Sequence, residues 1–102
     1  MRPPSRVPML VQWYADIDGE ESKIVPRLVE ILNEAGRANG AKQLGGPYHP
    51  QGNSLLFLSE YPDMASFQRS GKATVERIAR EGLAVIPVKY EIAFACGEAG
   101  GP

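Results

Sequence analysis

The stretch Ser54-Leu-Leu-Phe-Leu-Ser-Glu-Tyr61 decides the fold of this chain of 102 residues. It places bulky apolar and aromatic side chains between two turn-forming segments, 49–53 and 62–63, which is typical of a β-strand. Its apolar residues Leu55 to Leu58 are consecutive, and successive strand residues point to opposite faces, so both faces require burial. We therefore expect this segment to be a strand in the middle of a sheet.

The rest of the chain changes between a strand-like period of about two residues and a helical period of about 3.6 residues. The predicted order of elements is strand, helix, strand, strand, helix, strand. Their ranges are Met9–Ala15, Glu20–Ala35, Ala41–His49, Ser54–Tyr61, Asp63–Gly82 and Ala84–Ala95. This is the ferredoxin-like βαββαβ arrangement, an α+β fold in which a four-stranded antiparallel sheet carries both helices on one face. Right-handed crossovers place the first and third strands in the centre.

Two of the predicted strands contain residues that weaken the hydrogen bonding of a sheet. Gly45-Gly46-Pro47 interrupts the range 41–49, so we expect a bulge or an edge position there. Pro87 lacks an N–H donor, which predicts that the last strand lies at an edge or has a bulge near this proline.

The boundaries of the first helix are predicted from single residues. Asp18 or Ser22 is expected to cap its start, because short polar side chains accept hydrogen bonds from the first free N–H groups. Pro26 favours a late start, since proline is tolerated in the first turn of a helix. Gly36 is the expected terminator of this helix.

The second helix has clearer signals at both ends. Asp63 is expected as its N-cap and Gly82 as its end, whereas Gly71 is expected to kink or split it. The apolar or small residues that recur at helical spacing are Met64, Phe67, Gly71, Val75, Ile78, Ala79 and Gly82.

Composition excludes several classes of protein. With 11 Lys and Arg against 12 Asp and Glu, the net charge is −1, so we expect no nucleic-acid partner and no binding to anionic membranes. One cysteine forms no internal disulfide, and one histidine with one cysteine argues against a structural zinc site. We expect no metal or cofactor. No apolar run approaches the roughly 20 residues of a membrane span, and we expect a cytoplasmic protein.

The two ends of the chain are predicted to be flexible tails around one domain. Residues 1–8 read MRPPSRVP, and three prolines in eight residues favour neither helix nor sheet. Residues 97–102 are rich in glycine. The predicted domain is therefore 9–96, and Cys96 near its end is expected to be an unreactive thiol because no basic neighbour activates it.

The sheet face opposite the helices is expected to be apolar. Leu55–Leu58 and the strand 9–15 both carry apolar side chains on their two faces. Leaving several such side chains in water would forfeit several kcal/mol at about 25 cal/mol per Å². We therefore predict a two-fold homodimer that packs sheet against sheet. The alternative is a monomer with scattered apolar surface residues.

These features resemble the dimeric α/β-barrel superfamily, in particular its short members of uncharacterised function. The likeness rests on the order of elements, the chain length and the doubly apolar central strand. It covers most of Met9 to Phe94. The second half of the family is resembled by Gly40–His49, Leu55–Glu60, the helix opened by Pro62-Asp63 and the last strand opened by Val85–Val88. The resemblance implies a dimer with face-to-face sheets and ligand cavities between sheet and helices or inside the dimer barrel.

The same superfamily includes cofactor-free quinone-forming monooxygenases, haem-binding enzymes, isomerases and dehydratases. No catalytic motif of these enzymes carries over to this chain, and the helix-borne histidine of a haem ligand is absent. Fold likeness alone supplies no function.

Only a few residues are candidates for chemistry. His49 has an unperturbed pKa near neutrality and could act as a general base or bind a small acid; the alternative is an exposed histidine in a turn. Gln12 and Tyr14 share one face of a central strand, and Glu60 is expected to line the same cavity. Burying such polar groups unpaired costs about 1–3 kcal/mol, so they are the best indication of a ligand site.

Four aromatic residues with a polar tip form a second candidate set: Trp13, Tyr14, Tyr61 and Tyr90. They suit a pocket for a planar ligand, and equally the core or a dimer interface.

Two functions remain open from the sequence. The first is a binding or accessory domain for a small hydrophobic or aromatic ligand or for a protein partner. The second is a cofactor-independent monooxygenase or isomerase that uses His49 or a tyrosine as acid or base. The first is preferred, because the sequence offers no orienting partner for His49.

Overall fold

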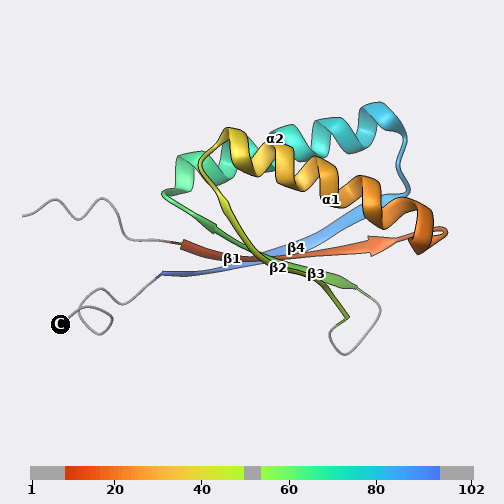
Figure 1. Ribbon diagram of the computed structural model, residues 1–102, viewed down its shortest axis with the longest axis horizontal. Helices are drawn as coiled ribbons and strands as arrows, with labels where there is room; N and C mark the ends of the chain where they lie inside the picture. Colours follow the sequence, from red (N-terminus) through yellow and green to blue (C-terminus); the bar gives the residue numbers. More distant parts are fainter. Residues whose placement is uncertain (1–8, 50–53, 95–102) are drawn as a thin grey trace, which may run out of the picture.

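The computed structural model describes residues 9–49 and 54–94 (Figure 1). Its elements are β1 (Met9–Ile17), α1 (Glu21–Ala38), β2 (Lys42–Tyr48), β3 (Leu55–Tyr61), α2 (Met64–Glu81) and β4 (Val85–Phe94). The predicted tails at 1–8 and 97–102, the turn residues 50–53 and Cys96 lie outside the described residues. No helix of the described part is long and apolar enough to cross a membrane.

The four strands form one antiparallel sheet in the order β2-β3-β1-β4. Both helices cover the same face of this sheet (Figure 1). The α+β class, the βαββαβ order and the central position of β1 and β3 are therefore confirmed. β2 and β4 are edge strands, as their glycines and prolines predict. The register shifts at Gly45 and Tyr48 in β2, and next to Ala15, the partner of Pro87.

The two central strands have one face under the helices and one open face. Met9, Val11 and Ala15 of β1 and Leu55 and Phe57 of β3 are buried on the helix side. The residues between them form the open face and are half-buried: Leu10, Gln12, Tyr14, Leu56, Leu58 and Glu60. The expected burial on both faces of β3 is thus observed only in part, because none of the residues in 9–49 and 54–94 covers the open face.

The register of β3 with its two neighbours, β1 and β2, is supported by side-chain hydrogen bonds. Ser54 Oγ donates to Asp16 Oδ1 over 2.6 Å, and Ser59 Oγ donates to Gln43 Oε1 over 2.9 Å. Each bond joins β3, or the residue before it, to a neighbouring strand.

Helix α1 differs from its prediction at both ends. Its N-cap is Glu20, without a side-chain cap, so the expectation of Asp18 or Ser22 was wrong, and Pro26 lies inside the helix rather than near its start. The helix also runs through Gly36 to Ala38. A Cβ at Gly36 would lie 2.9 Å from Gln43 Nε2, so this glycine serves close packing of α1 on β2 rather than termination.

Helix α2 has the predicted ends but a different inner face. Asp63 Oδ1 accepts from Ser66 N over 2.7 Å, and Gly82 ends the helix with a φ of 65°. Gly71 does not split the helix. The buried residues are Ser66, Phe67, Ser70, Thr74 and Ile78, whereas the predicted stripe residues Met64 and Val75 are exposed. Small hydroxyl residues therefore occupy much of the face that meets the sheet.

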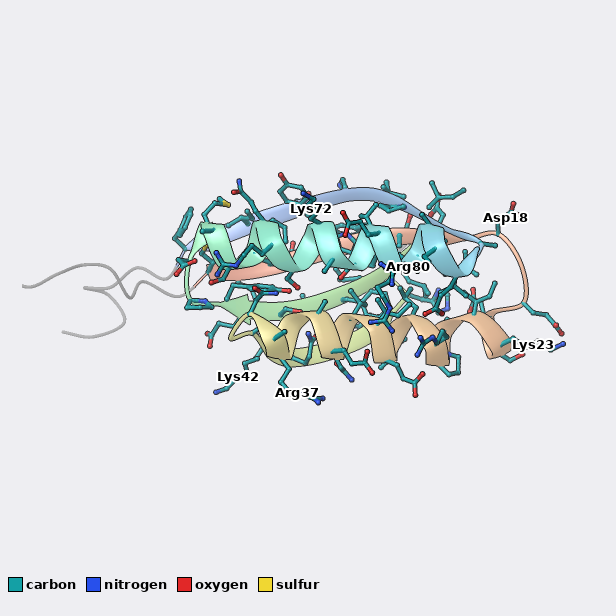
Figure 2. The ribbon with its side chains drawn as sticks, turned by 90° about the horizontal axis from the view of Figure 1, so that it is seen from above. Asp18, Lys23, Arg37, Lys42, Lys72 and Arg80 are labelled. Carbon is teal, nitrogen blue, oxygen red and sulfur yellow. The ribbon has the colours of Figure 1, made fainter. Side chains whose placement is uncertain are left out.

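The two helices lie side by side (Figure 2). Charged side chains connect them. Arg27 of α1 donates from Nε to Glu81 Oε1 of α2 over 2.7 Å and also contacts Glu81 Oε2. Arg77 of α2 donates to Glu34 Oε1 of α1 over 3.1 Å. The hydrogen bonds from Arg27 hold the pKa of Glu81 below its usual range.

Replacing Gly46 with alanine is expected to destabilise the fold. Gly46 has a φ of 117°, and a Cβ there would lie 2.9 Å from the carbonyl oxygen of Leu56 and 3.0 Å from Phe57 Cα. We expect Gly46→Ala to lower the free energy of unfolding by about 2 kcal/mol, measured by urea denaturation at equal chain concentration. An unchanged unfolding midpoint would contradict this role of Gly46.

The opposite effect is expected at Gly71. This residue lies inside α2, and beyond its chain neighbours and the nearby backbone of its own helix, no atom of the described residues lies within 4 Å of a Cβ built there. Gly71→Ala should therefore raise the free energy of unfolding by about 0.5–1 kcal/mol, because alanine loses less backbone entropy in a helix. The same urea measurement tests it, and a destabilised Gly71→Ala would show that the space beside Gly71 is filled.

Candidate functional site

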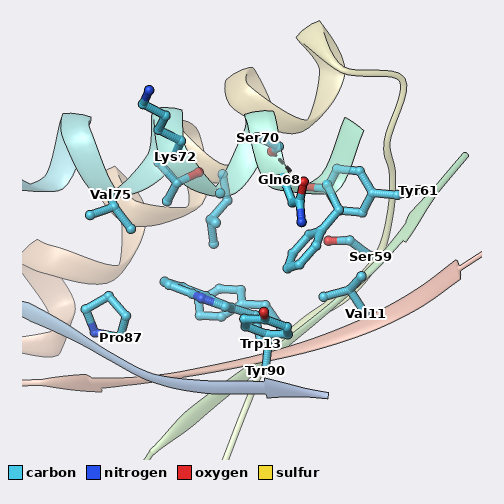
Figure 3. A pocket seen from close by; sticks show the side chains of 15 residues that line it. Val11, Trp13, Ser59, Tyr61, Gln68, Ser70, Lys72, Val75, Pro87 and Tyr90 are labelled. Carbon is cyan, nitrogen blue, oxygen red and sulfur yellow. Dashed lines mark hydrogen bonds between the residues drawn. The ribbon is translucent and has the colours of Figure 1, made fainter. Parts of the chain in front are cut away.

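A cavity of about 320 Å³ lies between α2 and the sheet (Figure 3). Its floor is formed by Trp13 and Phe57 on the central strands, and its roof includes Ser70, Gly71 and Thr74 of α2. The roof side chains are too small to fill the distance to the floor. The cavity therefore follows from the residues that α2 turns towards the sheet.

The lining is largely aromatic and aliphatic. The rings of Trp13 and Phe57 have centroids 5.8 Å apart, and the ring of Phe67 contacts Tyr61 at 5.4 Å and Tyr90 at 5.0 Å. Tyr90 belongs to the edge strand β4 and is 56% exposed, so the cavity is open at that edge. Aromatic walls around an open, mainly apolar space are typical of a site for a small organic ligand.

The structure divides the predicted aromatic set between the two faces of the sheet. Trp13, Tyr61 and Tyr90 line the cavity together. Tyr14 lies on the open face, where its ring is 4.8 Å from Lys89 Nζ.

The polar part of the cavity is a buried pair of hydroxyl groups. Tyr61 Oη and Ser70 Oγ are hydrogen-bonded over 2.7 Å, and both residues are buried. Burial raises the pKa of the Tyr61 phenol, although the bond to Ser70 partly opposes the shift. Tyr61 is therefore a neutral hydrogen-bonding group at pH 7.

Charged groups contribute little to the cavity. Lys72 is the charged residue among the described residues of the lining, and it is exposed, with its amino group turned away from the cavity (Figure 3). In the described ranges 9–49 and 54–94, no group of three or more His, Cys, Asp or Glu residues could hold a metal ion.

Three of the four predicted ligand-binding residues lie together, but outside this cavity. Gln12, Tyr14 and Glu60 are on the open face of the sheet and are half-buried. Glu60 pairs with Leu10, next to Gln12 on the same face of β1. Ligand binding by Gln12, Tyr14 and Glu60 stays a prediction.

His49, the fourth predicted residue, lies apart from these three. It follows β2 beside the first turn of α1, where its Nε2 is 3.4 Å from Glu21 Oε1. The His49 side chain is 59% exposed, and its Nε2 faces the Glu21 carboxylate rather than Glu60 or a tyrosine. Tyr48, its neighbour, is the register partner of Leu56 in β3.

Sequence reasoning missed several residues of the cavity, namely Phe57, Phe67, Ser70 and Thr74. One signal was present: Ser66, Ser70 and Thr74 are spaced four residues apart, which places them on one face of a helix. A row of small residues on a helix that must cover Trp13 and Phe57 indicates a gap between the two layers.

Comparison with known proteins finds a likeness of fold. No protein-family model matches the chain, and no curated protein matches it. Among solved structures it is similar to MupZ from Pseudomonas fluorescens, with a TM-score of 0.61, 13% sequence identity, and coverage of 98% of this chain and 77% of that chain. At this identity the likeness extends to the fold alone.

Proposed function

We propose that this chain is a homodimeric binding domain for a small hydrophobic or aromatic ligand, held in the cavity between α2 and the sheet. The observation that carries the proposal is the cavity itself, about 320 Å³ in volume and walled by Trp13, Phe57, Phe67 and Tyr90. Ligand pockets in proteins span about 300–1,000 Å³. The volume thus favours a ligand of one or two rings.

The proposal is binding rather than catalysis by His49. A cofactor-independent monooxygenase or isomerase needs an acid or base within hydrogen-bond reach of its substrate. His49 is exposed beside Glu21, away from the cavity, and Tyr61 inside the cavity has a raised pKa that disfavours its use as a base.

The proposed dimer uses the open face of the sheet. Leu10, Tyr14, Leu56 and Leu58 form an apolar surface there, and the helices lie on the other side. A second copy related by a two-fold axis would cover this face with an identical one. Gln12 and Glu60 would then lie inside the dimer, where a ligand or the partner chain satisfies their hydrogen bonds.

Filling the cavity is expected to abolish ligand binding. Gly71 lines the cavity, and open space surrounds its Cβ position, so Gly71→Leu places a side chain inside while α2 stays helical. Trp13 is the single tryptophan of the chain and lies in the wall, so its fluorescence reports binding of a probe such as tetralin. We expect a saturable change for the wild type and none for Gly71→Leu.

The matched control is Ala65→Leu, which adds the same side chain to α2 at an exposed position outside the cavity lining. This variant should bind tetralin like the wild type. Equal binding by Gly71→Leu and Ala65→Leu would place the ligand elsewhere.

A charge on the open face is expected to separate the dimer. Leu56→Lys places an ammonium group where two sheets meet, and burying it without a partner is costly. Sedimentation should show a dimer for the wild type and a monomer for Leu56→Lys with unchanged circular dichroism. Met64→Lys on α2, also at an apolar residue, should remain dimeric. A dimer that withstands Leu56→Lys would disprove the sheet-to-sheet interface.

A further inference from the structure

The hydroxyl pair of Tyr61 and Ser70 has one proton that is not used in a hydrogen bond. The Tyr61 and Ser70 hydroxyl groups each carry one donor proton, and the single bond between them over 2.7 Å consumes one of the two. In the part of the chain that the structure describes, neither side chain makes a second hydrogen bond. Tyr61 is 6% exposed and Ser70 is 2% exposed, so both hydroxyl groups belong to a largely buried part of the lining.

The two residues that share this spare donor line one end of the cavity. Tyr61, Ser59 and Gln68 gather near Ser70 at that end, whereas Val75 and Pro87 form the other end (Figure 3). The flat rings of Trp13 and Tyr90 lie along the floor (Figure 3). A ligand with one polar end and an apolar body would therefore have a single preferred orientation.

The ligand suited to this lining carries no net charge. Among the residues that the structure describes, no Asp or Glu belongs to the lining to pair with a cation. The one lysine, Lys72, is exposed and turned outward, so an anion would enter a mainly apolar space without a partner (Figure 3).

We propose that the Tyr61–Ser70 pair determines specificity by donating its spare hydrogen bond to the carbonyl oxygen of a flat, uncharged aromatic ketone. This inference rests on the proposed function and names the ligand class of the same cavity. A carbonyl oxygen accepts and does not donate, so it completes the pair and adds no new unpaired donor. Because burial raises the pKa of Tyr61, the donor proton is retained above neutral pH.

The test compares two probes that differ by one oxygen, α-tetralone and tetralin. Their dissociation constants are measured by Trp13 fluorescence for the wild type and for the double variant Tyr61→Phe/Ser70→Ala. Removing both hydroxyl groups leaves no buried hydroxyl without a hydrogen-bond partner, so we expect the double variant to fold. Circular dichroism verifies its fold. The control is Tyr48→Phe/Ser22→Ala, which removes the same groups outside the cavity lining.

The ratio of the two dissociation constants decides the outcome. We expect the preference for α-tetralone over tetralin to fall about tenfold in the double variant, the factor given by one hydrogen bond of about 1.4 kcal/mol, and to be unchanged in the control. If both probes bind and the ratio is equal in all three proteins, the specificity proposal is wrong while ligand binding stands. If neither probe binds to the wild type, both proposals are wrong.

Discussion

Helix α2 rests on the sheet through two large side chains, Phe67 near its start and Ile78 near its end. They belong to two separate hydrophobic clusters, one around Met9 and Val11 and the other around Ala15 and Leu28. Between these supports, the small residues of α2 do not reach the floor of the sheet. A continuous helix curves only gently, so α2 does not bend sharply towards the sheet between these two supports, and the space persists as a cavity.

The sheet could be predicted from the sequence because its signals are local and redundant. Alternating strands, the apolar run Leu55–Leu58 and the turn residues all agree with one topology, and the structure has it. Helix details were harder, because they depend on neighbouring elements. Gly36 resembles a terminator by residue type alone, yet its lack of a side chain is used for contact with Gln43 of β2, which no local pattern reveals.

The candidate site could be predicted only in part. Residue alternation correctly places Gln12, Tyr14 and Glu60 on one face of two adjacent strands. It also places Trp13 and Phe57 on the other face, but the cavity beside them depends on how α2 is rotated about its axis. The apolar stripe of the sequence suggested a rotation towards Met64 and Val75, whereas the helix turns Ser70 and Thr74 inward. Hydrophobicity alone does not predict an inner face made of hydroxyl residues.

The consecutive apolar residues of β3 also affect how reliably the chain folds. Since both faces of Leu55–Leu58 are apolar, sliding β3 by one residue would still bury hydrophobic side chains, so these four residues specify the alignment poorly. The residues around them remove the ambiguity. A slip would break the bonds of Ser54 to Asp16 and of Ser59 to Gln43. It would also turn Glu60 under the helices, where its carboxylate would be buried without a partner. The polar residues near the ends of β3 thus determine the register of its pairing, which the apolar residues in its centre do not determine.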